Sequence, residues 1–347
     1  MTDSSNTGAT ESIAVKDAPA IPGLSFRHFD PDSDYPAMLA VNNGSKIADG
    51  QDHDLHTLET ITYGYGTTRN HDPRKDVLVA EVGGKMVGYS RVFWDRELEG
   101  SRVYWHFGFV LPEWRGKGLG RAMIRWAEGH AREIEALQAD RENVSALAST
   151  EARDNMAGLE NLLKAEGYEP VRYEFHMETP DLDHIPDAAM PEGLEIRPAK
   201  PEHYKAIWEA SYEAFRDHWG AGEVDENDYN SWVTDPLLQP DLWVVAWDGD
   251  QVAGSILNYI NHEYNARMGD RKGRKIGYTE DISVRRPWRK RGLARALLAR
   301  SMQVHKERGM TQTALSVDTE NPSGALRLYE SMGYQVISKS TIYRKPL

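Results

Sequence analysis

The stretch from Tyr278 to Met302 reads YTEDISVRRPWRKRGLARALLARSM, and it decides the fold. It begins with the alternation of a β-strand, in which Ile282 and Val284 share one face. It continues as a helix whose apolar side is formed by Leu293, Leu297, Leu298 and Met302. The stretch therefore predicts a strand that leads into a helix through a basic turn containing a glycine.

The basic turn, residues 289–294, has the sequence RKRGLA. The first amides of a helix lack intrahelical partners and lie at the positive end of its dipole, so an anion bound there gains hydrogen bonds and a favourable field. Gly292 and the small Ala294 allow phosphates to approach the backbone closely. Six cations gather here in a chain of net charge -13: Arg285, Arg286, Arg289, Lys290, Arg291 and Arg295. This local positive charge indicates a polyanionic small molecule rather than a nucleic-acid backbone.

Two motifs in this region resemble those of a known family. The spacing Arg-x-x-Gly-x-Ala after an apolar strand is similar to the acyl-coenzyme A signature of the GCN5-related N-acetyltransferases, the GNAT superfamily. Residues 321–334, NPSGALRLYESMGY, resemble its second signature, an asparagine that opens a helix carrying a tyrosine and ending at Gly-Tyr. Taken alone, the first motif can be explained as the basic start of a helix, and the second as a helix with a tyrosine in the core. The order of the two motifs along the chain favours the functional interpretation.

The same pattern occurs twice in the chain. Residues 114–123, WRGKGLGRAM, match residues 288–297, WRKRGLARAL. The asparagine and the Gly-Tyr of the second signature recur at the same mutual spacing, at Asn155 and Gly167. The chain is therefore predicted to contain two copies of one domain.

The predicted organisation is an N-terminal domain at 21–179 and a C-terminal domain at 193–347. A small, polar tail at 1–20 is predicted to be disordered, and a linker with three prolines is predicted at 180–192. The resemblance implies that each copy is an α/β domain with a mixed, mostly antiparallel central sheet flanked by helices.

Composition excludes several other classes of protein. The chain has no cysteine, which excludes a disulfide framework, cysteine catalysis and thiolate metal sites. It has no apolar run long enough for a membrane span and no signal-peptide pattern, so a cytoplasmic protein without a membrane partner is expected. We expect no metal site, because no longer ligand pattern is present, and no nucleic-acid partner, because the chain is acidic outside the basic turn.

The resemblance implies a role for each matching residue in binding acetyl-coenzyme A (acetyl-CoA). Main-chain groups of Ile282 and Val284 would pair with the pantetheine arm where two strands splay apart, and Asn321 would contact the same arm. Arg289 would lie near the pyrophosphate. The amides that would hold the pyrophosphate belong to Arg291, Gly292, Leu293, Ala294 and Arg295.

The resemblance also implies a general acid, Tyr329, whose hydroxyl would lie near the thioester sulfur. For the base, Glu280 is our first choice and Asp281 the second, because Glu280 shares a strand face with Ile282. Three roles stay open for Glu280: it accepts a proton directly or through water, it binds a cationic acceptor, or it only pairs with a nearby arginine.

The first copy lacks these catalytic groups. Leu163 stands at the position of Tyr329, His106 at that of Glu280, and Phe107 replaces Asp281. A candidate second cofactor site remains at Val110, Arg115, Gly118 and Gly120. The N-terminal domain is therefore predicted to be degenerate, able to bind an acyl-coenzyme A but poorly equipped for turnover.

These inferences together predict an N-acetyltransferase whose C-terminal domain moves an acetyl group from acetyl-CoA to a primary amine of a small molecule by direct attack. The alternative is a non-catalytic acyl-CoA-binding or sensing protein. The arrangement is similar to tandem GNAT enzymes of the mycothiol synthase type, but their acidic residue falls where this chain has Tyr278, so their acceptor is not adopted. The acceptor, the acyl chain and the choice between monomer and homodimer stay open.

Overall fold

The computed structural model describes residues 12–51, 55–266, 273–321 and 323–347. The first half of the chain forms the elements β1 (Leu24–His28), α1 (Tyr35–Ala48), α2 (Leu58–Thr67), α3 (Pro73–Asp76), β2 (Val77–Val82), β3 (Lys85–Arg96), β4 (Arg102–Val110), α4 (Leu119–Ala136), β5 (Ala146–Arg153), α5 (Ala157–Ala165) and β6 (Glu169–Glu178). The second half forms β7 (Glu195–Arg197), α6 (Tyr204–Phe215), α7 (Glu226–Val233), β8 (Val244–Asp248), β9 (Gln251–Tyr259), β10 (Ile276–Val284), α9 (Leu293–Glu307), β11 (Gln312–Asp318), α10 (Ala325–Ser331) and β12 (Gln335–Pro346).

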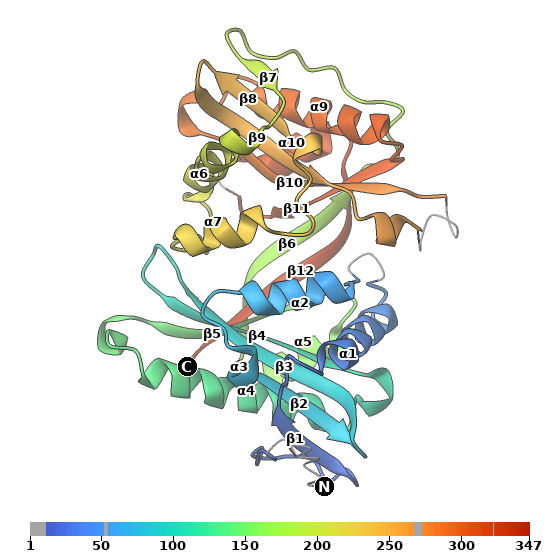
Figure 1. Cartoon of the computed structure of the whole chain (residues 1–347), viewed down its shortest axis with the longest axis vertical. Coiled ribbons are helices and arrows are strands. Elements are labelled where there is room, and N and C mark those ends of the chain that lie inside the picture. The colour runs from blue at the N-terminus through green and yellow to red at the C-terminus, as the bar shows by residue number, and fades with distance from the viewer. Residues whose placement is uncertain (1–11, 52–54, 267–272, 322) are drawn as a thin grey trace, which may run out of the picture.

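Helices cover both faces of the sheet in each half (Figure 1). Val77 and Val79 of β2 pack in one cluster with residues of α1, whereas Leu78 and Ala80 pack in another with residues of α4. Because successive strand residues point to opposite faces, α1 and α4 lie on opposite sides. In the second half α6 and α9 divide the faces of β8 in the same way. The predicted α/β class is confirmed.

The described strands form one continuous sheet in the order β1-β2-β3-β4-β5-β12-β6-β11-β10-β9-β8-β7. Most neighbours are antiparallel, and the pairs β4–β5 and β10–β11 are parallel. The central order shows an exchange of strands: β12 pairs with β5 of the first half, and β6 pairs with β11 of the second. β6 and β12 run side by side through the middle of the molecule (Figure 1).

The exchange is also visible in the cores. Met177 of β6 is buried in the cluster that contains Leu297 and Leu315 of the second half. Tyr343 of β12 is buried with Ile124 and Leu163 of the first half. Each half therefore completes its hydrophobic core with a strand that the other half supplies.

The two parallel pairs separate after a few residues. β10 pairs with β11 only from Ile276 to Tyr278, and β4 pairs with β5 only from Arg102 to Trp105. Beyond these points the neighbouring strands splay, as the resemblance implied for the second copy. Side chains and main-chain groups on the inner edges of the splayed strands can therefore line a cavity.

A β-bulge interrupts β10 directly after the splay. Glu280 pairs with Leu257 and Ser283 with Ser255, so two residues of β10 oppose one residue of β9. Asp281, inside the bulge, has the positive φ of 45° that is rare for a residue other than glycine. The expectation that side chains alternate strictly from Glu280 to Val284 is therefore wrong, because the bulge shifts the pairing with β9 by one residue. In the first copy, β4 pairs with β3 without a shift.

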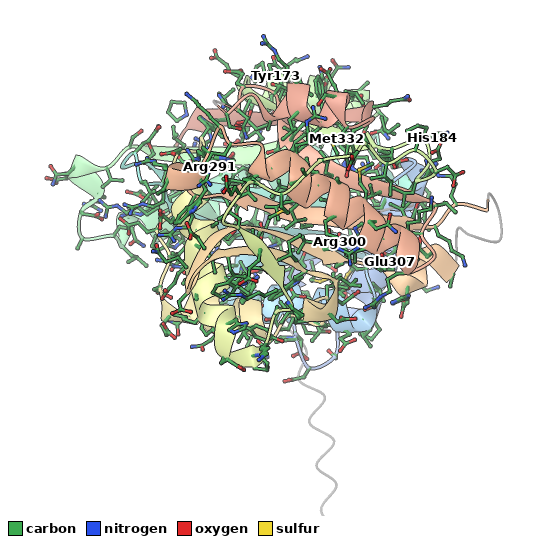
Figure 2. The ribbon with its side chains drawn as sticks, turned by 90° about the horizontal axis from the view of Figure 1, so that it is seen from above. Tyr173, His184, Arg291, Arg300, Glu307 and Met332 are labelled. Atoms are coloured by element: carbon green, nitrogen blue, oxygen red, sulfur yellow. The ribbon has the colours of Figure 1, made fainter. Side chains whose placement is uncertain are left out.

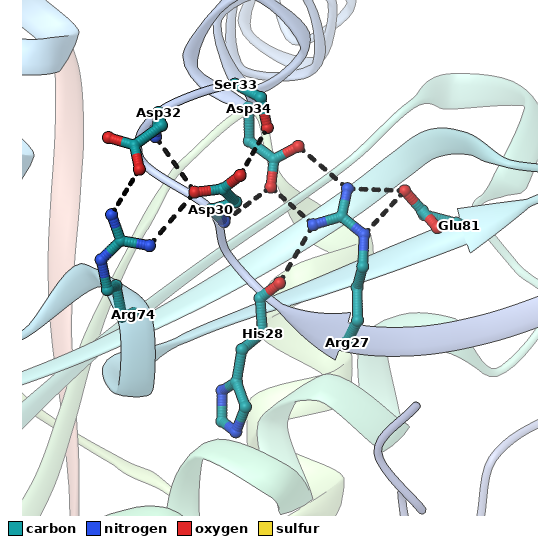
Figure 3. Close-up of polar contacts among 8 residues, drawn as sticks. All are labelled: Arg27, His28, Asp30, Asp32, Ser33, Asp34, Arg74 and Glu81. Atoms are coloured by element: carbon teal, nitrogen blue, oxygen red, sulfur yellow. Dashed lines mark hydrogen bonds and ion pairs between the residues drawn. The ribbon is translucent and has the colours of Figure 1, made fainter. Parts of the chain in front are cut away.

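A network of ion pairs fixes the start of α1 to the sheet (Figure 3). The guanidinium of Arg27 in β1 donates to Asp34, directly before α1, at 2.5 and 2.9 Å, and to Glu81 of β2 at 2.7 and 3.0 Å. Arg74 joins the same loop by pairing with Asp30 and Asp32. The first turn of α1 is therefore held beside β1 and β2.

The segment at residues 12–20 lies along the first half, although the sequence predicts a disordered tail there. Ile13 donates a main-chain hydrogen bond to Phe26 (2.7 Å), and Asp17 pairs with Arg125 of α4 (2.7 Å). Ile13 also packs against a buried apolar cluster. Residues 1–11 of the predicted tail fall outside the described residues.

Candidate active site

A cavity of about 900 Å³ lies where β10 and β11 splay, between the start of α9, the end of α6 and α10. It brings together nearly all the residues that the sequence singles out in the second copy. The predicted residues that line it are Glu280, Asp281, Ile282, Val284, Arg289, Gly292, Leu293, Ala294, Arg295, Asn321 and Tyr329. We call it the donor cavity.

Arg291 is the predicted residue that does not line the donor cavity. Its exposed side chain, labelled in Figure 2, donates a hydrogen bond to the main-chain carbonyl of Glu192 at 3.0 Å. Lys290, its neighbour, has a positive φ of 62°, so the turn twists just before the helix. This twist explains why adjacent basic side chains leave the turn in different directions.

The start of α9 is open to the donor cavity. Gly292 precedes the helix with a φ of 87°, a left-handed conformation that glycine adopts without strain. No side chain caps the helix, and a Cβ at Gly292 would meet no described atom within 4 Å. The unpaired amides of the first turn are therefore accessible to an anion.

Arg289 braces the wall beside this helix start. Its guanidinium donates to the carbonyl of Val284 (2.9 Å), to the carbonyl of Ala214 (3.0 Å) and to the carboxylate of Asp217 (2.8 Å). Hydrogen bonds from Arg286 and Arg289 hold the pKa of Asp217 well below its usual range. Arg289 therefore joins the end of β10 to the segment that follows α6.

Tyr329 and Asn321 reach the donor cavity from the region of α10. The Tyr329 side chain is only 6% exposed, and its hydroxyl makes no hydrogen bond to any residue that the structure describes. Burial, with Tyr334 nearby, raises the pKa of this hydroxyl above its ordinary value, so Tyr329 is protonated at neutral pH. The side-chain oxygen of Asn321 accepts a hydrogen bond from the amide of Ser323 at 2.8 Å.

Glu280 and Asp281 form an acidic pair on the cavity wall. Within the described part of the chain neither carboxylate has an ion-pair partner, and the role of Glu280 stays a prediction. Both side chains remain accessible to solvent, but the surrounding walls displace much of the bulk water. This burial and the charge of Asp281 raise the pKa of Glu280 to about 7, and burial raises the pKa of Asp281.

A second cavity of about 600 Å³ adjoins the first and shares Glu174, Glu280 and Ser316 with it. Both halves of the chain line it. Its aromatic and hydroxyl side chains include Thr60 and Tyr63 of α2, Trp232 of α7, and Tyr259 and Tyr278 of the second half. We call it the acceptor cavity, because it meets the donor cavity at the Glu280 carboxylate.

Sequence reasoning missed Glu174 and His218. Glu174 belongs to β6, which precedes the second copy in the chain, so it enters the site only through the strand exchange. Burial and the charges of Glu151 and Asp318 raise the pKa of Glu174 to about 7. His218 lines the donor cavity after α6, and burial lowers its pKa. Neither signature motif of the second copy includes this histidine.

The corresponding turn of the first copy has the same bracing arginine, and the N-terminal segment contacts it. Arg115 donates to the carbonyls of Val110 (3.0 Å) and Ser45 (3.2 Å) and to Asp49 (2.6 Å). Pro19 lies 3.4 Å from the position that a Cβ would take on Gly118. The segment at 12–20 thus contacts this helix start, although Gly118 stays exposed as Gly292 does.

Further residues of the first copy are also engaged. Leu162 lies 3.4 Å from the position that a Cβ would take on Gly120, and Asn155 donates to the carbonyl of Asp49. His106 is buried, its Nε2 lies 2.7 Å from the Tyr168 hydroxyl, and burial lowers its pKa to about 3. The imidazole is therefore neutral and packed in the core. Acyl-CoA binding by this copy stays a prediction.

Leu163→Tyr is expected to restore no activity to the first copy. Leu163 is 0% exposed, so a hydroxyl there overpacks the core at a cost of about 1–3 kcal/mol, and positions 106 and 107 still offer no carboxylate. The variant is best made in a Tyr329→Phe background, with Tyr329→Phe alone as control, and assayed for acetyl transfer. Recovery of turnover would contradict the degeneration of this copy.

The comparisons with known proteins agree with this geometry. The model of the acetyltransferase (GNAT) family matches residues 40–151 and 204–334, together more than half of the chain. The chain therefore belongs to the acetyltransferase (GNAT) family, and its enzyme class is that of an N-acetyltransferase. Membership implies an acyl-coenzyme A donor.

Relatives and solved structures align with nearly the whole chain. The mycothiol acetyltransferase of Nocardiopsis dassonvillei is 26% identical over 329 residues, covering 89% of this chain and 92% of the relative. A GCN5-related N-acetyltransferase from Sphaerobacter thermophilus is 26% identical, with a TM-score of 0.69 over 93% of this chain and 95% of that one. A tandem GNAT protein from the clavulanic acid biosynthesis pathway shares the fold at 13% identity, with a TM-score of 0.65 over 93% and 98% of the two chains.

Among the described residues, no group of three or more histidine, aspartate or glutamate residues is placed to hold a metal ion. No described helix is long and apolar enough to cross a membrane.

Proposed function

We propose that the second half of the chain transfers an acetyl group from acetyl-CoA to the primary amine of a small molecule. The observation that carries the proposal is the composition of the donor cavity. It is lined by an uncapped helix start, and by a tyrosine hydroxyl and two carboxylates that have no partner among the described residues. The first copy has His106 and Phe107 in place of these carboxylates and Leu163 in place of the tyrosine. We also propose a cytoplasmic location; monomer and homodimer stay open.

The donor is proposed to lie along the splayed edge of β10. Main-chain groups of Ile282 and Val284 lack a strand partner on the β11 side, so an extended pantetheine arm can pair with them as an added strand would. The pyrophosphate then reaches the open amides at the start of α9. Arg295 supplies a further positive charge at the cavity wall.

The reaction is proposed to proceed in one displacement. The amine nitrogen attacks the thioester carbonyl, so that a C–N bond forms and the C–S bond breaks. Before the attack the bound ammonium gives one proton to Glu280, directly or through a water, which leaves a neutral amine. Tyr329 donates its hydroxyl proton to the departing thiolate, and the second proton lost by the nitrogen passes through water to restore that hydroxyl. Holding both reactants in adjoining cavities replaces a bimolecular encounter by an oriented one.

The acceptor is proposed to be cationic before it reacts. Glu174 and Glu280 lie at the junction of the two cavities without an ion-pair partner among the described residues, so a protonated amine there gains charge pairing that water cannot match. Amines on sugars, polyamines, antibiotics and peptides fit this description. Tyr278 stacks on Tyr259 (4.9 Å between ring centroids), and both rings line the acceptor cavity.

The test is to incubate the full chain with acetyl-CoA and a panel of such amines, and to measure release of the coenzyme A thiol together with the mass of the product. Because the chain has no cysteine, the released coenzyme is the only thiol in the assay. Acetylation of at least one amine is expected. Tight binding of acetyl-CoA without thiol release from any amine would favour the sensing alternative.

The acceptor kcat/KM is expected to rise with pH through an ionisation near pH 7. Glu280 has a pKa of about 7, so it is protonated and unable to accept a proton below that pH, and ionised above it. Glu280→Gln is expected to remove this ionisation and to lower the plateau about 100-fold. Asp281→Asn should keep it, shifted to lower pH because the neighbouring charge is gone. If Asp281→Asn removes the ionisation instead, Asp281 is the base.

A further inference from the structure

The turn between β3 and β4 of the first half docks on the second half beside the donor cavity. The amide of Leu98 donates to the carbonyl of Ala221 (2.8 Å), and the amide of Glu223 donates to the carbonyl of Arg96 (3.0 Å). Glu97 itself pairs with Gly222 in an antiparallel bridge. We call residues 216–223 the cleft loop.

A buried ion pair supports this contact from below. The Arg344 guanidinium, on the exchanged strand β12, donates to both carboxylate oxygens of Glu97 at 2.5 and 3.2 Å, and both side chains are 9% exposed. The same guanidinium lies 4.1 Å from the ring centroid of Trp219 in the cleft loop. Gly220, with a φ of 71°, passes so close that a Cβ there would lie 3.2 Å from the Glu97 carboxylate. The pair therefore touches the cleft loop with both of its members.

The other end of the cleft loop belongs to the donor site. Asp217 pairs with Arg289, and His218 and Asp217 both line the donor cavity. Between Asp217 and Ala221 the loop has few main-chain hydrogen bonds of its own: Ala221 donates to His218 at 3.3 Å. Its position is therefore set by its two ends, Arg289 on one side and the Glu97–Arg344 pair on the other.

We propose that Glu97 and Arg344 are positioning residues for the donor site, through which the first half of the chain holds the wall that receives acetyl-CoA. The inference rests on the proposed function, because it assigns the donor to this cavity. Without the pair, the cleft loop samples more conformations, and ordering it on binding costs affinity. The catalytic groups Tyr329 and Glu280 lie on other elements and are unaffected.

The test replaces both members of the pair at once, by Glu97→Gln with Arg344→Met. This choice avoids leaving one buried charge without its partner. The Kd of acetyl-CoA, measured by titration calorimetry, and its KM are expected to rise about tenfold, while kcat at saturating donor stays within about threefold. A second variant, Trp219→Leu, removes the loop side of the contact from a half-buried position and is expected to act in the same direction.

The matched control removes a comparable pair in the first half that does not touch the cleft loop. Arg102 and Glu135 lie 2.7 Å apart, with side chains 3% and 14% exposed. Arg102→Met with Glu135→Gln should lower the melting temperature without changing the Kd of acetyl-CoA. An equal loss of affinity in this control would overturn the proposal, since general destabilisation would then explain the effect.

The remaining outcomes also decide the matter. If Trp219→Leu and the Glu97/Arg344 variant bind acetyl-CoA as the wild type does, the positioning role fails while the proposed function stands. If the double variant does not fold, the Trp219→Leu titration decides alone. If the wild type binds no acetyl-CoA, the proposed function and this inference fall together.

Discussion

Tyr329→Phe is expected to lower kcat by about 100-fold or more while the Kd of acetyl-CoA changes by less than about twofold. The substitution removes only the hydroxyl, which has no hydrogen-bond partner among the described residues, so the ring and its packing against Tyr334 remain. The lost group is the proposed proton donor to the departing thiolate, and it acts in the transition state alone.

The measurement is a steady-state assay of thiol release combined with calorimetric titration of acetyl-CoA into the same preparation. Tyr334→Phe is the matched control, because it removes a buried hydroxyl from a neighbouring ring whose role is packing. A parallel loss of donor affinity in Tyr329→Phe would assign Tyr329 a structural part. An unchanged kcat would remove it from the mechanism.

Gly292→Glu combined with Ala294→Glu is expected to weaken acetyl-CoA binding by more than about 100-fold, because two carboxylates at the helix start repel the pyrophosphate and occupy its place. Gly292 has a left-handed φ, so the variant also carries backbone strain and needs a control with the same strain. Gly118→Glu combined with Gly120→Glu provides it, since Gly118 has a φ of 88° in the first copy.

Circular dichroism first shows that each variant is folded. Titration of acetyl-CoA into both variants then shows which of the two turns binds the donor. Retained binding in the Gly118/Gly120 variant and lost binding in the Gly292/Ala294 variant assign the donor to the second copy. The reverse result would place the donor in the first copy and contradict the proposed site.

The parts of the site that follow from local sequence could be predicted. The strand, the basic turn and the helix around Gly292 are contiguous, and the apolar face of Leu293, Leu297, Leu298 and Met302 is buried as expected. The repeat also allowed the two copies to be compared position by position, which showed that Leu163 stands where the second copy has Tyr329. These features depend on periodicity and on glycine, which act over a few residues.

The parts of the site that depend on long-range strand pairing could not be predicted from the sequence. The pattern of β6 fits any neighbour, so nothing in it shows that the strand pairs with β11 and brings Glu174 to the second copy. The bulge at Asp281 adds one residue to a strand that otherwise alternates normally. The contact of Pro19 with Gly118 depends on the path of a polar segment without a period.

The strand exchange also constrains the order in which the protein can be completed during synthesis. Among the described strands β5 obtains its outer neighbour from β12, which spans Gln335–Pro346, so the first half keeps an unpaired strand edge until this strand has left the ribosome. β6 likewise lacks its neighbour from the second half until β11 has been made. Although the two halves share one repeated pattern, neither can complete its sheet and fold before the other is present. Cleavage at 180–192 would leave each half without one strand of its sheet.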